Sequence, residues 1–238
     1  MTAAFRERLA GAARRGGPII LAADLPPDAD IGRDTVSMLD TLQDNICAVK
    51  MNLQALLPLG VGEIRRITHH AAGLGLQCIA DIKLNDIGNT NAAVSRVLWG
   101  AGFDALIANP IMGPSALSKL AGSAHQEERG IISLCHMSSH EGAVSYEMQV
   151  GGRALYTKFL DWGLAAGVDG IVVGATFPHI ISACRREAGG SVDIVSPGVG
   201  AQGGSAREAF ERGSDYVIVG RSLLESDDPA RTARSLLP

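Results

Sequence analysis

Short, mostly apolar runs recur along the whole chain, and their starts lie between 23 and 40 residues apart. Each run is nearly continuous in apolar residues rather than alternating, which is typical of strands covered on both faces in a parallel sheet. The runs that predict strands are 19–23, 46–50, 78–82, 105–108, 130–134, 170–173, 193–196 and 216–219.

Helical periodicity fills the intervals between these runs. Residues 61–72 place Ile64, Ile67 and Ala71 on one face and Arg65 off it, and 91–100 and 206–212 behave in the same way. The segments GAGFDALIA, AAGVDGIVV and ERGSDYVIV share one pattern of connection, in which the end of a helix is followed by Gly, Asp and a strand. Eight such units in 238 residues predict a (β/α)8 TIM barrel. The competing architecture is a doubly wound open sheet.

No linker or low-complexity segment interrupts this series, so we expect one domain over residues 1–238. Residues 1–17 predict a short N-terminal helical extension that covers one end of the domain. This segment is rich in Arg, which leaves a transit peptide as the alternative, but it lacks the apolar stretch of a signal peptide.

Composition and charge narrow the classes of partner. The hydrophobic share of 46% indicates a folded globular protein, and the net charge of −4, with no basic block longer than Arg14–Arg15, argues against nucleic acid. Apolar runs of about eight residues are too short to span a membrane. The four cysteines show no C-x-x-C spacing, which favours reduced, buried thiols in a cytoplasmic protein.

Charged residues gather where the predicted strands end, at the end of a barrel that carries catalytic groups. Asp24 and Lys50 follow or end the first two strands, and Asp81 and Lys83 lie two apart on the third, where the pleat would turn both inward. A structural ion pair is the simpler interpretation of Asp81 and Lys83. An alternating array of carboxylates and ammonium groups would also hold a proton donor beside fixed negative charge, which suits a reaction that makes a carbanion from a carboxylate.

The segment ADIKLNDIGNT carries the pattern D-x-K-x-x-D-I-x-x-T, with Asp81, Lys83, Asp86 and Thr90 at its polar positions. This pattern resembles the signature of the orotidine 5′-monophosphate decarboxylase family in its short microbial form. The similarity extends over nearly the whole chain. The further strings that carry it are LAADL with Asp24, AVKMN with Lys50, HMSSHEGA with Ser138, SPGVGAQGG with Pro197 and Gln202, and IVGRS with Gly220 and Arg221.

The resemblance implies a cofactor-free, metal-free decarboxylation of orotidine 5′-monophosphate to uridine 5′-monophosphate in de novo pyrimidine biosynthesis. In that reaction Lys83 protonates C6, Asp81 lies against the departing carboxylate and Lys50 orders the charges. The resemblance also implies the substrate contacts: ribose at Asp24, the pyrimidine at Ser138, and the phosphate end at Pro197, Gln202, Gly220 and Arg221.

The same resemblance implies an obligate homodimer with shared active sites, in which Asp86 and Thr90, placed on the turn after the third strand, reach the neighbouring subunit's substrate. Two departures from the family pattern affect the pyrimidine pocket rather than the charged array. Asn109 stands where many members have His, and His136 stands where an acidic residue is common.

Other functions remain open from the sequence. Related sugar-phosphate enzymes, 3-keto-L-gulonate 6-phosphate decarboxylase and hexulose-phosphate synthase, share D-x-K-x-x-D but use magnesium with Glu where this chain has Lys50. A non-catalytic phosphoribosyl-binding barrel is the second alternative. The string GVGAQG matches a dinucleotide-binding motif, but only 35 residues follow it. His136 and His140 have a spacing that suggests zinc, but no third ligand lies nearby in the sequence.

Overall fold

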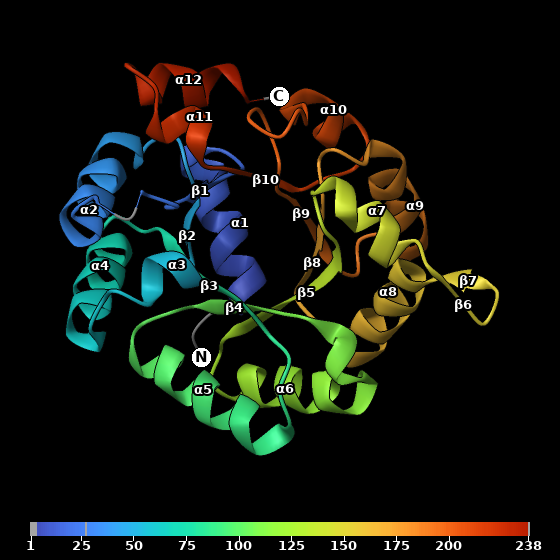
Figure 1. The fold of residues 1–238 in the computed structure, drawn as a ribbon. Helices are drawn as coiled ribbons and strands as arrows, with labels where there is room; N and C mark the ends of the chain where they lie inside the picture. The colour runs from blue at the N-terminus through green and yellow to red at the C-terminus, as the bar shows by residue number, and fades with distance from the viewer. Residues whose placement is uncertain (1–3, 27, 238) are drawn as a thin grey trace.

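The computed structural model describes residues 4–26 and 28–237. Within these residues the main sheet is a closed barrel of parallel strands, in the order β1-β10-β9-β8-β5-β4-β3-β2 (Figure 1). The barrel strands are β1 (Ile19–Ala22), β2 (Ala48–Asn52), β3 (Gln77–Leu84), β4 (Ala105–Ala108), β5 (Gly130–His136), β8 (Gly170–Val173), β9 (Asp193–Ser196) and β10 (Tyr216–Val219). The predicted TIM barrel is therefore confirmed, and the open-sheet alternative is wrong.

Helices surround the strands (Figure 1). Their bounds are α1 (Phe5–Gly16), α2 (Ile31–Leu42), α3 (Leu53–Leu56), α4 (Val61–Gly73), α5 (Gly88–Gly100), η1 (Pro110–Met112), α6 (Pro114–Gln126), α7 (His140–Tyr146), α8 (Leu155–Ala166), α9 (Pro178–Ala188), α10 (Ala206–Glu211), α11 (Arg221–Leu224) and α12 (Pro229–Ser235). The predicted helix 61–72 is α4, and Ile64, Ile67 and Ala71 are buried as its periodicity requires. Among the described residues, no helix is both long and apolar enough to cross a bilayer.

Two details differ from the sequence prediction. Helix α5 begins at Gly88, so Thr90 lies in its first turn and not in the connecting turn after β3. A hairpin of β6 (Gln149–Val150) and β7 (Arg153–Ala154) projects from the barrel between α7 and α8 (Figure 1). It was not predicted, because each of its strands has two residues and neither is buried.

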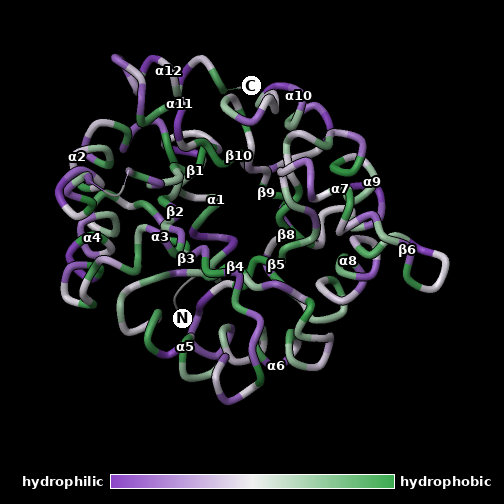
Figure 2. Tube along the Cα trace, in the orientation of Figure 1, coloured by the Kyte–Doolittle hydropathy of each residue, from purple (hydrophilic) through white to green (hydrophobic). Residues whose placement is uncertain are grey.

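The hydrophobic core has two layers separated by the strands. The larger one lies between strands and helices, and the smaller one fills the barrel interior with side chains such as Ile20, Ile79 and Ile132. In Figure 2 the trace is largely hydrophobic along the strands, whereas hydrophobic and hydrophilic residues alternate along the surrounding helices. The four cysteines are free and buried, in agreement with the expected reduced thiols.

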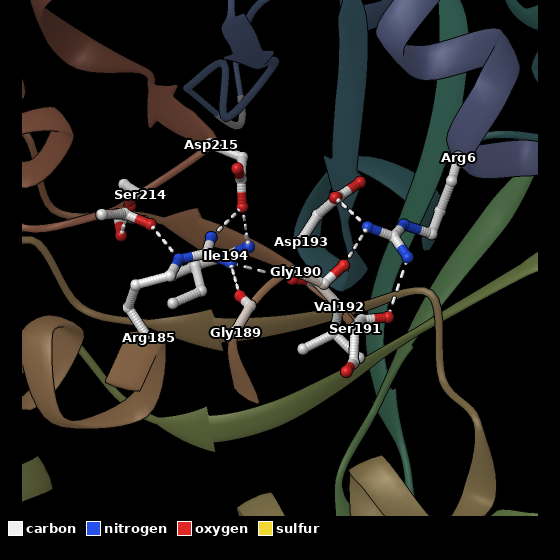
Figure 3. A network of polar contacts seen from close by, with 12 residues as sticks. Arg6, Arg185, Gly189, Gly190, Ser191, Val192, Asp193, Ile194, Ser214 and Asp215 are labelled. Atoms are coloured by element: carbon white, nitrogen blue, oxygen red, sulfur yellow. Dashed lines mark hydrogen bonds and ion pairs between the residues drawn. The ribbon is translucent and has the colours of Figure 1, made fainter. Parts of the chain in front are cut away.

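Helix α1 closes the end of the barrel opposite the strands' carboxyl ends. Its Phe5 and Leu9 belong to the interior layer of the core, and α1 is visible through the ring of strands in Figure 1. The Arg6 guanidinium donates to Asp193 at 2.7 Å and to the Ser191 carbonyl at 2.8 Å (Figure 3). The same view shows Arg185 paired with Asp215, whose carboxylate also accepts from the backbone of β9. Ionic contacts thus fasten this end of the molecule.

Candidate active site

A cavity of about 890 Å³ lies at the carboxyl ends of the barrel strands. The predicted site residues that line it are Asp24, Lys50, Asp81, Lys83, Ser138, Pro197, Gln202, Gly220 and Arg221. Residues that are far apart in the sequence meet here because every barrel strand delivers its last residues to this end. Asp86 and Thr90 are exposed and do not line the cavity.

Four charged side chains form one connected array in the cavity. Asp81 is at its centre, with Oδ2 2.9 Å from Lys50 Nζ and Oδ1 2.8 Å from Lys83 Nζ. Lys50 Nζ also lies 3.6 Å from Asp24 Oδ1. Lys50 and Asp81 are buried, whereas 40% of the Lys83 side chain is exposed, which leaves its ammonium group accessible from the cavity.

The electrostatics keep Asp81 ionised. Burial alone would raise the pKa of Asp81, but the charges and hydrogen bonds of Lys50 and Lys83 outweigh burial and hold that pKa below its usual value. The array therefore presents a permanent negative charge between two ammonium groups.

The backbone that carries Lys83 is not a regular strand. Pairing of β3 with β4 shifts register between Ala80 and Leu84, and Lys83 has a left-handed φ of 46°. The sequence correctly predicted that the side chains of Asp81 and Lys83 lie together. The predicted cause, a regular pleat, is wrong, because the strand is irregular at Lys83. A left-handed non-glycine residue costs about 1–3 kcal/mol and is found preferentially at functional sites.

Asp24 lies two residues beyond the end of β1. Its Oδ1 is buried, and no described residue donates a hydrogen bond to it. That oxygen lies only 3.6 Å from Lys50 Nζ, but the Asp24 side chain as a whole lines the cavity and is 34% exposed, so its carboxylate can accept from a ligand hydroxyl.

The segment after β5 is held against the cavity by two neighbouring loops. A Cβ atom at Gly174 would lie 2.5 Å from Ser138 Cα, and one at Gly198 would lie 2.8 Å from Ser138 Cβ, so neither position has room for a side chain. Thr176 Oγ1 donates to the Ser138 carbonyl at 2.8 Å. These contacts fix Ser138, and Met137 beside it forms part of the cavity wall.

One end of the cavity is formed by the Gly-rich loop after β9 and by the start of α11. Gly198, Gly200 and Gly203 all adopt positive φ, which lets the loop fold back on itself. Gln202, Gly220 and Arg221 line this end. Amide, backbone N–H and guanidinium donors converge there, a donor set suited to a phosphate monoester. The loop is a barrel turn, and the dinucleotide-domain interpretation of GVGAQG is therefore wrong.

Several lining residues escaped the sequence reasoning. The polar ones are Asn52, Gln54, Ser139, His140 and Glu141, and the apolar ones are Ile107, Leu134, Val172 and Ile218. Asn52 ends β2, so it could have been found, like Lys50, by looking for polar residues where the predicted strands end. His140 and Glu141 of α7 lie within the string HMSSHEGA that carries the family resemblance, but only Ser138 was taken from it as a substrate contact.

The two histidines with metal-like spacing are in different environments. His136 ends β5 and is buried beneath Phe177 and Tyr146, whereas His140 begins α7 at the cavity mouth. Within the described part of the chain, His, Cys, Asp and Glu side chains form no group of three or more that could hold a metal ion.

Comparisons with known proteins agree on one protein family. The family model described as "Orotidine 5'-phosphate decarboxylase / HUMPS family" matches residues 17–236. The orotidine 5'-phosphate decarboxylase of Pyrococcus abyssi is 33% identical over 218 residues, which is 92% of this chain and 96% of that protein. The one from Methanosarcina acetivorans is 32% identical over 85% of this chain and 87% of its own length. The crystal structure of the Pyrococcus horikoshii enzyme matches with a TM-score of 0.76 at 29% identity, covering 92% of this chain and 96% of that chain.

Proposed function

Because the chain belongs to the orotidine 5′-phosphate decarboxylase / HUMPS family, we propose that it converts orotidine 5′-monophosphate to uridine 5′-monophosphate and carbon dioxide in pyrimidine biosynthesis. The observation that carries this function is the position of Asp81, in contact with both Lys50 and Lys83 in the cavity. The reaction needs such an array, since it leaves an electron pair on an unactivated ring carbon.

The chemical step is assigned to Asp81 and Lys83. The bond between C6 and the carboxylate breaks, its electron pair stays on C6, and carbon dioxide leaves beside the fixed charge of Asp81. Lys83 Nζ gives a proton to C6 and afterwards regains one from solvent. Lys50 holds Asp81 in place through its 2.9 Å contact. Preorganised charge of this kind is usually the largest contribution to catalysis, and the barrier reduction required is on the order of 20 kcal/mol.

Substrate binding is assigned to groups around this array. Asp24, whose side chain is partly exposed to the cavity, accepts from ribose hydroxyls, and Ser138 contacts the pyrimidine. Pro197, Gln202, Gly220 and Arg221 hold the phosphate. Binding energy from the phosphate, remote from C6, can be used to bring the reacting groups together.

The sugar-phosphate enzymes of the same family are the main alternative. They use magnesium with a carboxylate at the position of Lys50, and an ammonium group cannot ligate a cation. Lys50 instead contacts two carboxylates, Asp24 and Asp81. A non-catalytic binding barrel would have no use for a buried charge array with a strained lysine beside it.

We further propose a homodimer with shared sites. Asp86 and Thr90 lie outside their own cavity, exposed next to Ile87, which is itself 71% exposed. Leu57 and Ile111 are also exposed. These apolar residues follow β2, β3 and β4, three neighbouring strands, so they lie on one side of the barrel mouth. An apolar surface there supports a subunit interface that delivers Asp86 and Thr90 to the partner's cavity.

The proposal extends to the organisation of the chain and its location. Residues 1–238 act as one domain, and the enzyme works in the cytoplasm, where its buried thiols stay reduced. Of the predicted extension 1–17, helix α1 closes the barrel, and residues 1–3 lie outside the described residues.

The test of the activity is the loss of orotidine 5′-monophosphate absorbance with purified protein, measured with EDTA and with added magnesium. We expect the same turnover in both, because Lys50 and Lys83 supply the positive charge. Turnover that requires magnesium, or that occurs only with a sugar phosphate, would overturn the proposal.

A further inference from the structure

Asn91 makes a paired contact with the backbone of Asp86. Its side chain is buried on α5, with 3% exposed. The Asn91 Oδ1 atom accepts from the Asp86 N–H at 3.0 Å, and Asn91 Nδ2 donates to the Asp86 carbonyl at 2.7 Å. Nδ2 also lies 3.2 Å from the Met112 sulfur. The Asn91 side-chain amide therefore hydrogen-bonds both the backbone N–H and the backbone carbonyl of Asp86.

This contact fixes the backbone of Asp86 and leaves its carboxylate facing outward. Asp86 itself is exposed, and its Oδ1 accepts from the Ile87 N–H at 2.6 Å, which sets the orientation of the carboxylate. An exposed loop residue would otherwise sample several backbone conformations, and a misplaced catalytic group can cost about 100-fold in rate.

Lys83 is anchored separately from Asp86. Leu84 pairs with Ala108 of β4, and the Asn109 N–H donates to the Leu84 carbonyl at 2.9 Å. This anchor lies between Lys83 and Asp86 in the chain. A change at Asn91 is therefore expected to move Asp86 while Lys83 stays in contact with Asp81.

We propose that Asn91 is a positioning residue that acts on the reaction through Asp86. This inference rests on the proposed function, in which Asp86 contributes to the decarboxylation site. Asn91 contacts no other charged group of the site in the described residues, and its effect on turnover passes through the placement of one carboxylate.

A double-mutant cycle tests the inference. Asn91→Ala in the wild-type background should lower kcat/KM by about 10- to 100-fold, mainly through kcat, because the carboxylate is displaced. In the Asp86→Ala background the same change should have almost no further effect, since there is no carboxylate left to position. Asn91→Asp sets a carboxylate oxygen against the Asp86 carbonyl in place of the donor, so it should lose activity as Asn91→Ala does.

Ser95→Ala is the matched control. Ser95 lies one turn further along the same helix, is also buried, and its hydroxyl has no hydrogen-bond partner among the described residues. It should keep wild-type activity. Equal losses from Asn91→Ala in both backgrounds, or no loss in the wild-type background, would overturn the inference.

A second readout does not depend on turnover. Exchange of the Asp86 amide hydrogen with solvent should be faster in Asn91→Ala than in the wild type or Ser95→Ala, because Asn91 Oδ1 no longer accepts from it. An unchanged exchange rate would contradict the proposal that Asn91 fixes the backbone of Asp86. Failure of the proposed function is recognised separately, by a wild-type protein that does not consume orotidine 5′-monophosphate.

Discussion

At the scale of single residues, the site combines strain with paired burial of charge. Lys83 has a left-handed backbone, and its ammonium group contacts a carboxylate that is almost completely buried. Neither feature favours folding in isolation, but together they hold a proton donor beside a fixed negative charge.

His136 is a different buried titratable group. Its Nδ1 lies 2.8 Å from the Met137 carbonyl and its Nε2 lies 3.5 Å from Glu147.

His136 should make stability fall at mildly acidic pH. Burial lowers the pKa of His136 and outweighs the Met137 carbonyl and Glu147, which raise it, while the nearby His179 lowers it slightly further. The unfolded chain then binds the proton more readily than the folded chain, so stability is lost as pH falls from about 6.5 through the lowered pKa. Urea unfolding between about pH 8 and about pH 5 should show a larger loss of unfolding free energy for the wild type than for His136→Gln. Equal losses in both proteins would contradict this assignment.

At the scale of elements, the apolar runs were enough to predict each barrel strand, because a buried parallel strand is recognisable from its own residues. The same reasoning could not find β6 and β7, whose residues are not buried. It placed Thr90 in the turn after the third strand and the next helix at 91–100, yet α5 begins at Gly88. Gly88 and Asn89 are poor helix formers, so local propensity does not indicate this earlier start. The left-handed φ of Lys83 depends on the irregular pairing of β3 with β4, a tertiary contact that the local sequence does not encode.

The attachment of α1 can be tested by mutation. Arg6→Ala removes the 2.7 Å pair with Asp193 and two hydrogen bonds to backbone carbonyls. Both partners are partly exposed, so the expected loss in the free energy of unfolding is about 1 kcal/mol. Arg33→Ala is the control, because its pair with Asp34 lies on an exposed surface of α2, and it should leave the free energy of unfolding almost unchanged. Equal effects in denaturant unfolding would contradict a fastening role for Arg6.

At the scale of the whole molecule, stabilising contacts and the candidate active site lie at opposite ends of the barrel. Helix α1 and its arginines close one end, whereas the charged array and the loops proposed to bind phosphate lie at the other. Within the cavity, sequence motifs located residues on or just after six strands, since all of these strands end at the same face. Asp86 and Thr90 were found by the same motif but lie outside the cavity of their own chain, which a motif cannot reveal.

Subunit mixing tests the shared site. Asp86→Ala and Lys83→Ala should each be nearly inactive, but in a heterodimer one site carries both changes and the other carries neither. Random mixing gives about half heterodimer, so about a quarter of wild-type activity should return by this symmetry argument. If activity does not return although exchange of subunits is demonstrated, Asp86 works within its own chain.

The most direct test of the account is the effect of Lys83→Ala on turnover and binding measured together. Lys83 is the group assigned to protonate C6, and the loops proposed to hold the phosphate follow other strands. We predict that kcat for orotidine 5′-monophosphate falls by several orders of magnitude while uridine 5′-monophosphate still binds. Turnover within about tenfold of the wild type would contradict the account, because another group would then be supplying the proton.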